Sequence, residues 1–360
     1  MRLLFLSGAR RYFSHKLSPL RDPSFVYRLH NSAISAKILG HQVGIYHNLD
    51  LLNPIVPRNW DIAIMHRPSF NTQFEMTLDK LQKYKIPIFG DFDDLIFSYP
   101  HANHRPSVIN GFESIEESRM RVKKHLQAID CIDGVTVSNT FLKNIFVNSV
   151  KEHKQCIQLS NSWHYSWKDK IDYEKKQQSL KQNLSSREKT IYLTYFSGTK
   201  THDSDLAMIE DQLINLTDKE KNLKFLVIGK VSLSKKLKEK SLQIKKVPFS
   251  KYHQLVSQSH LNIAPLESTF FNNAKSSIKI IEAGFFGIQT VCSPIPEYIS
   301  TPETSRLIAY TWNDWVKQLK QGIQNRNNSS LLKRLKRDIK EKYHPLETTK
   351  KFISKLESRL

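Results

Sequence analysis

Short apolar segments alternate with helical segments along most of the chain, and this alternation restricts the fold more than any other feature. In the first half, the pattern predicts strands at residues 3–6, 42–46, 62–65, 86–89, 134–137 and 156–159, with helices at 25–39, 72–84, 112–128 and 139–149. In the second half, it predicts strands at 191–196, 225–228, 244–247, 261–264, 290–292 and 307–309. Strands that alternate with helices are typical of parallel α/β domains. The sequence therefore predicts an α/β protein.

One polar stretch, residues 168–190, interrupts this alternation and is rich in Lys, Gln, Glu and Ser. The chain has 360 residues, of which 39% are hydrophobic, enough for two domains with separate cores. We expect a Rossmann-like, doubly wound domain at 1–167, a linker at 168–190 and a second Rossmann-like domain at 191–330. Residues 331–360 are expected to form basic helices that pack back on the first domain. Two such domains that face one another would bind a ligand at the carboxyl ends of their strands.

The formal net charge is +21, and such a field attracts nucleic acid, acidic membranes and anionic small molecules. Much of the charge lies at 235–246 and in the tail from Leu331. The tail places Leu332, Leu335 and Ile339 at helical spacing between basic residues. This pattern fits a helix on an anionic membrane surface, or a helix packed against its own protein. No nucleic-acid-binding module is recognised, so nucleic acid is not expected as a partner.

The cysteines and the amino terminus indicate the compartment. The cysteines are Cys131, Cys156 and Cys292, and neither their number nor their spacing supports disulfides or structural zinc. This favours a reducing compartment. Only four consecutive apolar residues precede Ser7, too few for the core of a signal peptide, and no later segment reaches the ~20 residues of a spanning helix. We expect a cytoplasmic protein. No third ligand stands out beside His101 and His104, so no metal is assigned.

Residues 262–293 contain the most informative local pattern, a strand, a loop of Asn and Ser, a helix and a second strand. We expect the helix to begin at Lys275, Ser276 and Ser277, with Lys279 close behind. The free N–H groups and the dipole at a helix N-terminus favour an anion such as phosphate. Two turns further on, Glu282 is placed to accept hydrogen bonds from a ribose. The pattern therefore suggests a nucleotide site, and the alternative is an ordinary amphipathic helix with solvated charges.

Several segments carry a resemblance to a known family: YFSGTKTHD at 195–203, FLVIG at 225–229, the stretch 264–284, GDFDDLIF at 90–97, and Asn161. Through them the chain resembles retaining glycosyltransferases of the GT-B architecture, of the group 1 (family 4-like) type that builds bacterial surface polysaccharides. The match is strong over 191–300 and weaker elsewhere. The resemblance implies a nucleotide-diphosphate sugar donor, a polyprenyl-linked or growing oligosaccharide acceptor, and a reaction that needs neither a metal nor another cofactor.

The resemblance and the local patterns together give the candidate site residues. Cations that stabilise the leaving diphosphate are expected to be catalytic, and these are Lys275 and Lys279. The donor is expected to contact Gly198, Thr199, His202, Asn272, Asn273, Ser276, Ser277 and Glu282. The acceptor side is expected to contain Gly8, His66 and Arg67, with Asp91 and Asp93 to orient or deprotonate a hydroxyl. For the two aspartates the alternative is a capping cluster, and for His66 and Arg67 a structural surface pair.

The sequence departs from the family at one position. Family members carry a Glu-x7-Glu pair, and Ala274 stands where the first Glu would be. Alanine cannot accept a hydrogen bond from a sugar hydroxyl, so Asn272 or Asn273 would have to substitute. Three functions therefore stay open: a glycosyltransferase held peripherally at the inner face of the membrane by anionic lipid, an inactive nucleotide- or sugar-binding module of the same fold, and a basic nucleic-acid-binding protein.

Overall fold

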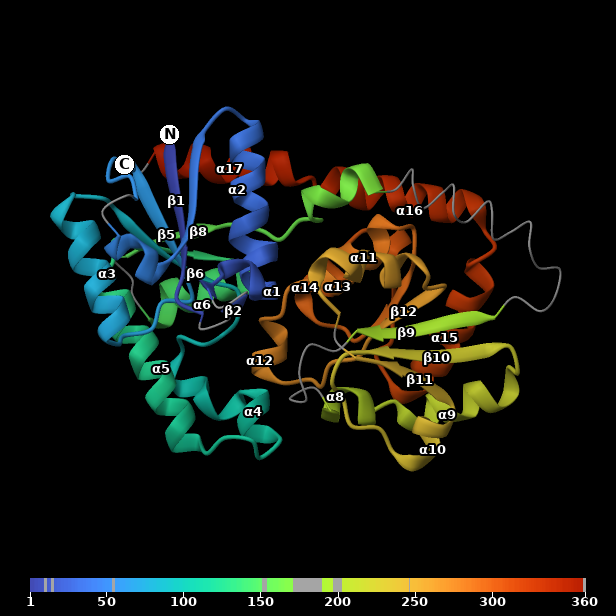
Figure 1. Cartoon of the computed structure of the whole chain (residues 1–360). Coiled ribbons are helices and arrows are strands. Elements are labelled where there is room, and N and C mark those ends of the chain that lie inside the picture. The colour runs from blue at the N-terminus through green and yellow to red at the C-terminus, as the bar shows by residue number, and fades with distance from the viewer. Residues whose placement is uncertain are drawn as a thin grey trace. The chain divides into compact units, whose positions relative to one another are not determined.

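The computed structural model describes residues 1–9, 12–13, 16–53, 56–150, 154–170, 190–196, 203–245 and 247–358. Contacts between its elements divide the chain into two compact units (Figure 1). The first unit comprises Met1–Tyr165, Ala274–Ser276 and His344–Leu360, and the second comprises Ser166–Asn273 and Ser277–Tyr343. Most of the expected linker, residues 171–189, lies outside the described residues.

The first unit is built on a six-stranded sheet in which every pairing is parallel. Its strands, in spatial order, are β4 (Gln42–His47), β1 (Arg2–Ser7), β5 (Ile62–His66), β6 (Ile88–Phe92), β7 (Gly134–Val137) and β8 (Gln155–Gln158). Strands β5, β6 and β7 are buried along their whole length. A parallel sheet covered by helices on both faces needs such continuous apolar runs, which is why the sequence shows runs and not alternation.

Helices from both ends of the chain cover this sheet. The segment predicted as one helix at 25–39 contains α1 (Pro23–Phe25), a π-type stretch (Val26–His30) and α2 (Asn31–Ile38). The other helices of the unit are α3 (Thr72–Lys83), α4 (Pro106–Ile109), α5 (Ile115–Asp130), α6 (Thr140–Ser149) and α17 (Pro345–Glu357). Helix α17 packs on α2 and contributes Phe352, Ile353 and Leu356 to the core that contains Leu3 and Ile64. A two-stranded antiparallel ribbon, β2 (Tyr12–Phe13) with β3 (Lys16–Leu17), follows β1.

The second unit repeats the plan with another six-stranded parallel sheet. Its strands, in spatial order, are β11 (Ser241–Ile244), β10 (Leu223–Ile228), β9 (Ile191–Phe196), β12 (Leu261–Ala264), β13 (Thr290–Cys292) and β14 (Arg306–Ile308). All twelve predicted strands are present, and the prediction of a doubly wound α/β fold is confirmed. The prediction for β11, at 244–247, was wrong by three residues. Because β11 is an edge strand whose two central side chains are exposed, its apolar pattern is weak.

The helices of the second unit are α8 (Asp203–Ala207), α9 (Glu210–Lys219), α10 (Lys235–Glu239), α11 (Phe249–Ser257), α12 (Phe270–Asn273), α13 (Ile278–Phe285), α14 (Pro296–Ile299), α15 (Trp312–Asn325) and α16 (Ser329–Lys342). Helix α16 packs on α13, and its Leu335 and Ile339 are buried. Its apolar edge is thus packed against its own protein, as one of the two alternatives for the tail required. A Cβ on Gly284 of α13 would lie 2.6 Å from Ile339 Cγ1, so this crossing needs glycine.

In the part of the chain that the structure describes, no helix combines the length and the apolar character that crossing a bilayer requires.

Candidate functional site

Polar side chains gather at the carboxyl ends of the strands of the first sheet, the edge where doubly wound sheets bind ligands. Ser7 ends β1 and is the register partner of His47 at the end of β4 and of His66 at the end of β5. His66 is in turn the register partner of Asp91 in β6, and Asp91 is that of Thr136 in β7. The strand register alone therefore aligns five polar residues along one edge.

Asp91 is the centre of a buried hydrogen-bond network. Its Oδ1 accepts hydrogen bonds from Arg28 Nη2 and Thr136 Oγ1, both at 2.6 Å. Its Oδ2 lies 3.2 Å from Arg28 Nε and 3.3 Å from His66 Nδ1. The side chains of Arg28 and Asp91 are 1% and 0% exposed. Burial by itself would raise the pKa of Asp91, but the charge of Arg28 and these hydrogen bonds hold it well below its usual range.

This geometry corrects the expectation that Asp91 orients or deprotonates an acceptor hydroxyl. Its carboxylate is closed to solvent and is bound by Arg28, Thr136 and His66. We assign Asp91 a positioning role, because it fixes Arg28 and the ring of His66. Asp93 is also engaged, since the hydroxyl of Ser24 and Nε of Arg67 both donate to it. Attraction by Arg67, opposed by burial, holds the pKa of Asp93 below its usual range.

Arg67 has an unusual backbone and two acidic partners. Its φ of 45° lies in the left-handed region that few residues other than glycine occupy. Its Nε donates to Asp93 Oδ1 at 2.6 Å and its Nη2 donates to Asp94 Oδ2 at 2.8 Å. Burial tends to lower the pKa of Arg67, but the two carboxylates raise it above its ordinary value. The positive charge of Arg67 is therefore largely neutralised by Asp93 and Asp94. Asp94 also accepts a hydrogen bond from Lys275 Nζ at 2.7 Å within the same unit.

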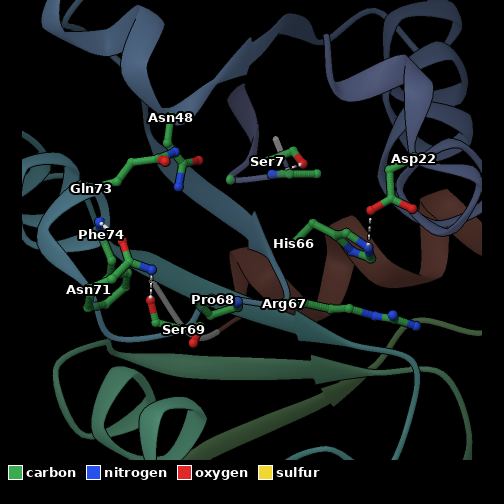
Figure 2. A pocket seen from close by; sticks show the side chains of 12 residues that line it. Ser7, Asp22, Asn48, His66, Arg67, Pro68, Ser69, Asn71, Gln73 and Phe74 are labelled. Atoms are coloured by element: carbon green, nitrogen blue, oxygen red, sulfur yellow. Dashed lines mark hydrogen bonds and ion pairs between the residues drawn. The ribbon is translucent and has the colours of Figure 1, made fainter. Parts of the chain in front are cut away.

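A pocket of about 180 Å³ opens at this edge of the first sheet (Figure 2). It brings together Gly8, His66 and Arg67, the three residues predicted for the acceptor side, whereas Asp91 and Asp93 do not line it. The other lining residues are Ser7, Ala9, Asp22, Asn48, Pro68, Ser69, Asn71, Gln73 and Phe74. In Figure 2 the side chain of Arg67 extends away from Asn48 and Gln73.

Three residues of this site were not among the predicted ones: Arg28, Asn48 and Gln73. Asn48 directly follows β4 and comes two residues after the strand predicted at 42–46, so its place at the end of a parallel strand was a usable signal. Arg28 lies in a helical segment and is buried. A buried arginine without a counter-charge lowers the stability of the fold, so its position indicated an acidic partner. Gln73 lies in the first turn of α3, and nothing in the local sequence distinguishes it from other polar helix residues.

In the second unit, α13 begins later than predicted. Its first residue is Ile278 and its N-cap is Ser277, which is buried and whose side chain makes no capping hydrogen bond. Lys275 and Ser276 precede the helix and belong to the first unit, where Asn161 Nδ2 donates to Ser276 Oγ at 2.8 Å. The expectation that the helix opens on Lys275 was therefore wrong. As at any helix start, the first backbone N–H groups of α13, from Ser277 and Ile278, have no hydrogen-bond acceptor inside the helix.

Glu282, the predicted ribose acceptor, lies on α13 and is 4% exposed. The hydroxyl of Tyr252 on α11 donates to its Oε2 at 3.0 Å. Tyr252 also packs edge-to-face against Phe196 at the end of β9, with the ring centroids 5.3 Å apart. Burial and the nearby charge of Glu282 raise the pKa of Tyr252 well above its usual value, so this tyrosine stays a hydrogen-bond donor. Tyr252 thus holds the carboxylate of Glu282 in place.

The remaining donor-side candidates differ in their surroundings. Asn272 is buried, and its Nδ2 donates to Asp205 Oδ1 at 3.2 Å and to the carbonyl of Glu267 at 3.0 Å. Asn273 ends α12 and is half-buried. Lys279 lies on α13 with Nζ 4.8 Å from the centroid of the Tyr195 ring, a cation–π contact. The other candidates, Gly198, Thr199 and His202, lie outside the described residues.

Three histidine, cysteine or acidic side chains that together could hold a metal ion do not occur among the residues the structure describes.

No protein-family model matches the chain, and no curated protein sequence matches it. Solved structures do match it from end to end. HepE from Anabaena in complex with UDP has a TM-score of 0.62 and 9% identity, with 99% of this chain and 100% of that chain covered. A glycosyltransferase from Rickettsia africae has a TM-score of 0.61 and 13% identity, with 99% and 97% covered. Sucrose-phosphate synthase from Thermosynechococcus elongatus has a TM-score of 0.60 and 11% identity, with 100% and 99% covered. The chain shares their fold, the two-sheet architecture called GT-B.

Proposed function

We propose that this protein is a glycosyltransferase that transfers a sugar from a nucleotide-diphosphate sugar to an acceptor hydroxyl. The observation that carries the proposal is the likeness in fold, which spans the whole chain and almost the whole length of each similar structure. The similar HepE structures include complexes with UDP and with UDP-glucose. The polar edge of the first sheet and the buried Glu282 on α13 are two local features that such chemistry would use.

The residues divide into a donor side and an acceptor side. Breaking the anomeric C–O bond builds negative charge on the β-phosphate, and Lys275, Lys279 and the first N–H groups of α13 are the groups proposed to stabilise it. Glu282, fixed by Tyr252, is proposed to accept hydrogen bonds from the ribose. We propose a retaining reaction without a metal, in which the departing phosphate takes the acceptor proton. The pocket lined by Gly8 and His66 is the proposed acceptor site.

The acceptor class that we propose is a polyprenyl-linked or growing oligosaccharide of a bacterial surface polysaccharide such as O-antigen or capsule. The alternative is a module that binds a nucleotide or sugar without turnover. Ala274 motivates this alternative. Asn272 is the group that we propose replaces the lost glutamate, because its Nδ2 is held by Asp205 and Glu267 while its Oδ1 accepts no hydrogen bond from the described residues.

The decisive experiment measures donor binding and turnover with the full-length chain. Uridine, guanosine, adenosine and thymidine diphosphates are titrated in parallel with a mixed-sequence oligonucleotide, and we expect one nucleotide diphosphate to raise the melting temperature. Release of the same nucleotide from its sugar conjugates, measured with an extract of polyprenyl-linked oligosaccharides as acceptor, then separates an enzyme from a binding module. Preferential binding of the oligonucleotide would refute the proposal.

We further propose that basic surfaces hold the protein to anionic lipid at the inner face of the membrane. Lys333, Arg334 and Arg337 of α16 are exposed, as are Lys350 and Lys351 of α17. Since the apolar edge of α16 is buried, the attraction must be electrostatic, worth on the order of 1 kcal/mol per cation near the surface and screened by salt. Binding to vesicles with anionic lipid should therefore fade as salt rises. Equal binding to neutral vesicles, or no binding to anionic vesicles at low salt, would exclude this role.

A further inference from the structure

Three buried polar atoms line the pocket of the first unit without a hydrogen-bond partner among the described residues. They are Asn48 Oδ1, His66 Nε2 and Gln73 Nε2. Asn48 and His66 are each 5% exposed. The nearest charged group to His66 Nε2 is Asp22 Oδ2 at 3.9 Å, beyond hydrogen-bond distance. Buried polar atoms in native proteins are almost always paired with protein, ligand or water, so three unpaired atoms around one cavity mark a place where a polar ligand can bind in place of water.

The hydrogen-bonding character of these atoms defines the ligand. Asn48 Oδ1 only accepts hydrogen bonds and Gln73 Nε2 only donates them. His66 Nδ1 faces Asp91 Oδ2, and His66 Nε2 lies 3.9 Å from Asp22 Oδ2. Asp22 also lines the pocket, and its carboxylate only accepts hydrogen bonds. The pocket therefore presents two kinds of acceptor, Asn48 Oδ1 and the Asp22 carboxylate, and one donor, Gln73 Nε2. A ligand must donate at least two hydrogen bonds to satisfy them, which hydroxyl groups do and ionised phosphate or carboxylate groups do not.

The charges around the pocket support the same conclusion. Arg67 is the one cation among the described lining residues, and its guanidinium is paired with Asp93 and Asp94. Asp22 adds a carboxylate to the lining, which would repel an anion. The cavity volume of about 180 Å³ is room for at least one sugar ring.

We propose that this pocket binds an uncharged sugar ring of the acceptor through two neighbouring hydroxyls, and that it selects against phosphorylated and carboxylated sugars. That the sugar belongs to the acceptor rests on the proposed glycosyltransferase function. That the pocket binds an uncharged sugar rests on the three unpaired atoms. Asn48 and Gln73 are the residues that determine specificity, and His66, oriented by Asp91, supplies the third contact. The amides of Asn48 and Gln73 both lie beside Gly8, within 4 Å of where a Cβ on this glycine would be, and Figure 2 shows their side chains on the same side of the pocket.

The test uses the full-length chain and defined probes in place of the unknown acceptor. Methyl glycosides of glucose, galactose, mannose and N-acetylglucosamine are compared with glucose 6-phosphate and glucuronic acid by saturation-transfer NMR and by titration. We expect at least one neutral glycoside to bind at millimolar concentration or better, and the two anionic sugars to bind at least tenfold more weakly. Tighter binding of the anionic sugars, or no binding of any neutral glycoside, would overturn the proposal.

Variants connect this binding to the named atoms. Asn48→Ala and Gln73→Ala are each expected to weaken the neutral glycoside by about tenfold or more, the usual effect of leaving a buried partner unpaired. Gly8→Ala provides a filling variant, because its Cβ would lie 3.1 Å from Asn48 Nδ2 and 3.6 Å from Gln73 Nε2. The backbone at Gly8 is outside the left-handed region, so alanine is tolerated there. Gln82→Ala, an exposed glutamine on the same helix as Gln73, is the matched control and should change nothing.

Nucleotide binding separates this proposal from the proposed function. We expect all four variants to bind the preferred nucleotide diphosphate and its sugar conjugate as the parent does. If Asn48→Ala and Gln73→Ala instead weaken the sugar conjugate but not the free nucleotide diphosphate, the ring in the pocket is the donor's and the assignment to the acceptor is wrong. If no nucleotide binds to any form while the glycoside still binds to the parent, the glycosyltransferase assignment fails and the sugar pocket stands.

Discussion

Replacing Asp91 by asparagine is expected to lower the free energy of unfolding of the first unit by about 3–5 kcal/mol, as when one partner of a buried ion pair is removed. The guanidinium of Arg28 is 1% exposed and would lose its counter-charge without gaining access to water. Thr136 and His66 would each lose part of a hydrogen bond to the same carboxylate. The measurement is hydrogen exchange of the amides of β5 and β6, which reports the first unit separately from the second.

The chain offers a matched control for this substitution. Arg2 and Asp61 form the same kind of ion pair at 2.5 Å, but their side chains are 41% and 31% exposed. Asp61→Asn is therefore expected to cost about 1 kcal/mol or less, as for other exposed pairs. An equal effect of the two substitutions would contradict the role assigned to burial. The double replacement Arg28→Met with Asp91→Leu should recover much of the loss, because it removes both charges together.

The pH dependence of the same comparison has a definite sign. The folded-state pKa of Asp91 is lowered, so its contribution to stability is present above the unfolded value of about 4 and is lost as the pH falls below it. The difference between the parent and Asp91→Asn should therefore be full near neutral pH and shrink progressively below about pH 4. A difference that grows as the pH falls would mean that another group dominates.

Replacing Lys275 by alanine is expected to lower turnover by roughly 10²–10³, the effect of removing one preorganised electrostatic group from a site where charge develops. The substitution should change kcat more than KM, because attraction to the leaving phosphate strengthens as the bond breaks. Glu282→Gln is expected to act differently. It would weaken an acceptor for a part of the donor that the reaction leaves unchanged, and so raise KM by an amount equivalent to about 1.5–3 kcal/mol.

The ion pair of Lys275 with Asp94 requires a further control, since a purely structural lysine would also matter. If Lys275 serves only to pair with Asp94, then Lys275→Ala should lose no more stability and no more activity than Asp94→Asn, which also weakens the pair of Asp94 with Arg67. If it serves the diphosphate, Lys275→Ala should lose far more activity at a similar melting temperature. Tyr252→Phe, which removes the hydroxyl that holds Glu282, should reproduce part of the rise in KM. A folded Lys275→Ala variant with the parent's transfer rate would refute the mechanism.

The strands of both sheets were predictable from sequence because buried parallel strands are short continuous apolar runs. The edge strand β11 was misplaced for the opposite reason, since its middle residues Leu242 and Gln243 are exposed and no core constrains them. Once the strand order is known, the alignment of Ser7, His66 and Asp91 follows from register. Strand order itself depends on contacts between segments far apart in the chain, which local patterns do not contain.

The roles of individual side chains were less predictable than their positions. Asp91 was expected after the strand at 86–89 but lies inside β6, and only Asp93 follows that strand. Their partners Arg28, Ser24 and Arg67 come from other elements. Whether a carboxylate faces solvent or a guanidinium is decided by that packing. Asn48 and Gln73 likewise gain meaning only because two distant segments bring their amides to one cavity. Local spacing in the sequence therefore indicates which residues lie at the edge of the sheet. Only the folded structure distinguishes the side chains that face the pocket from those that hold other side chains in place.

Helix α17 has a consequence for how this protein can be divided and recombined. The first unit takes its last helix from the carboxyl terminus, and Phe352, Ile353 and Leu356 complete the core around β1 and β5. A fragment that stops near residue 165 would expose this core, and a chimera that exchanges only the amino-terminal half would join a sheet to a foreign closing helix. Any exchange of acceptor specificity between proteins of this architecture should therefore transfer residues 344–358 together with residues 1–165, because the two segments form one structural unit.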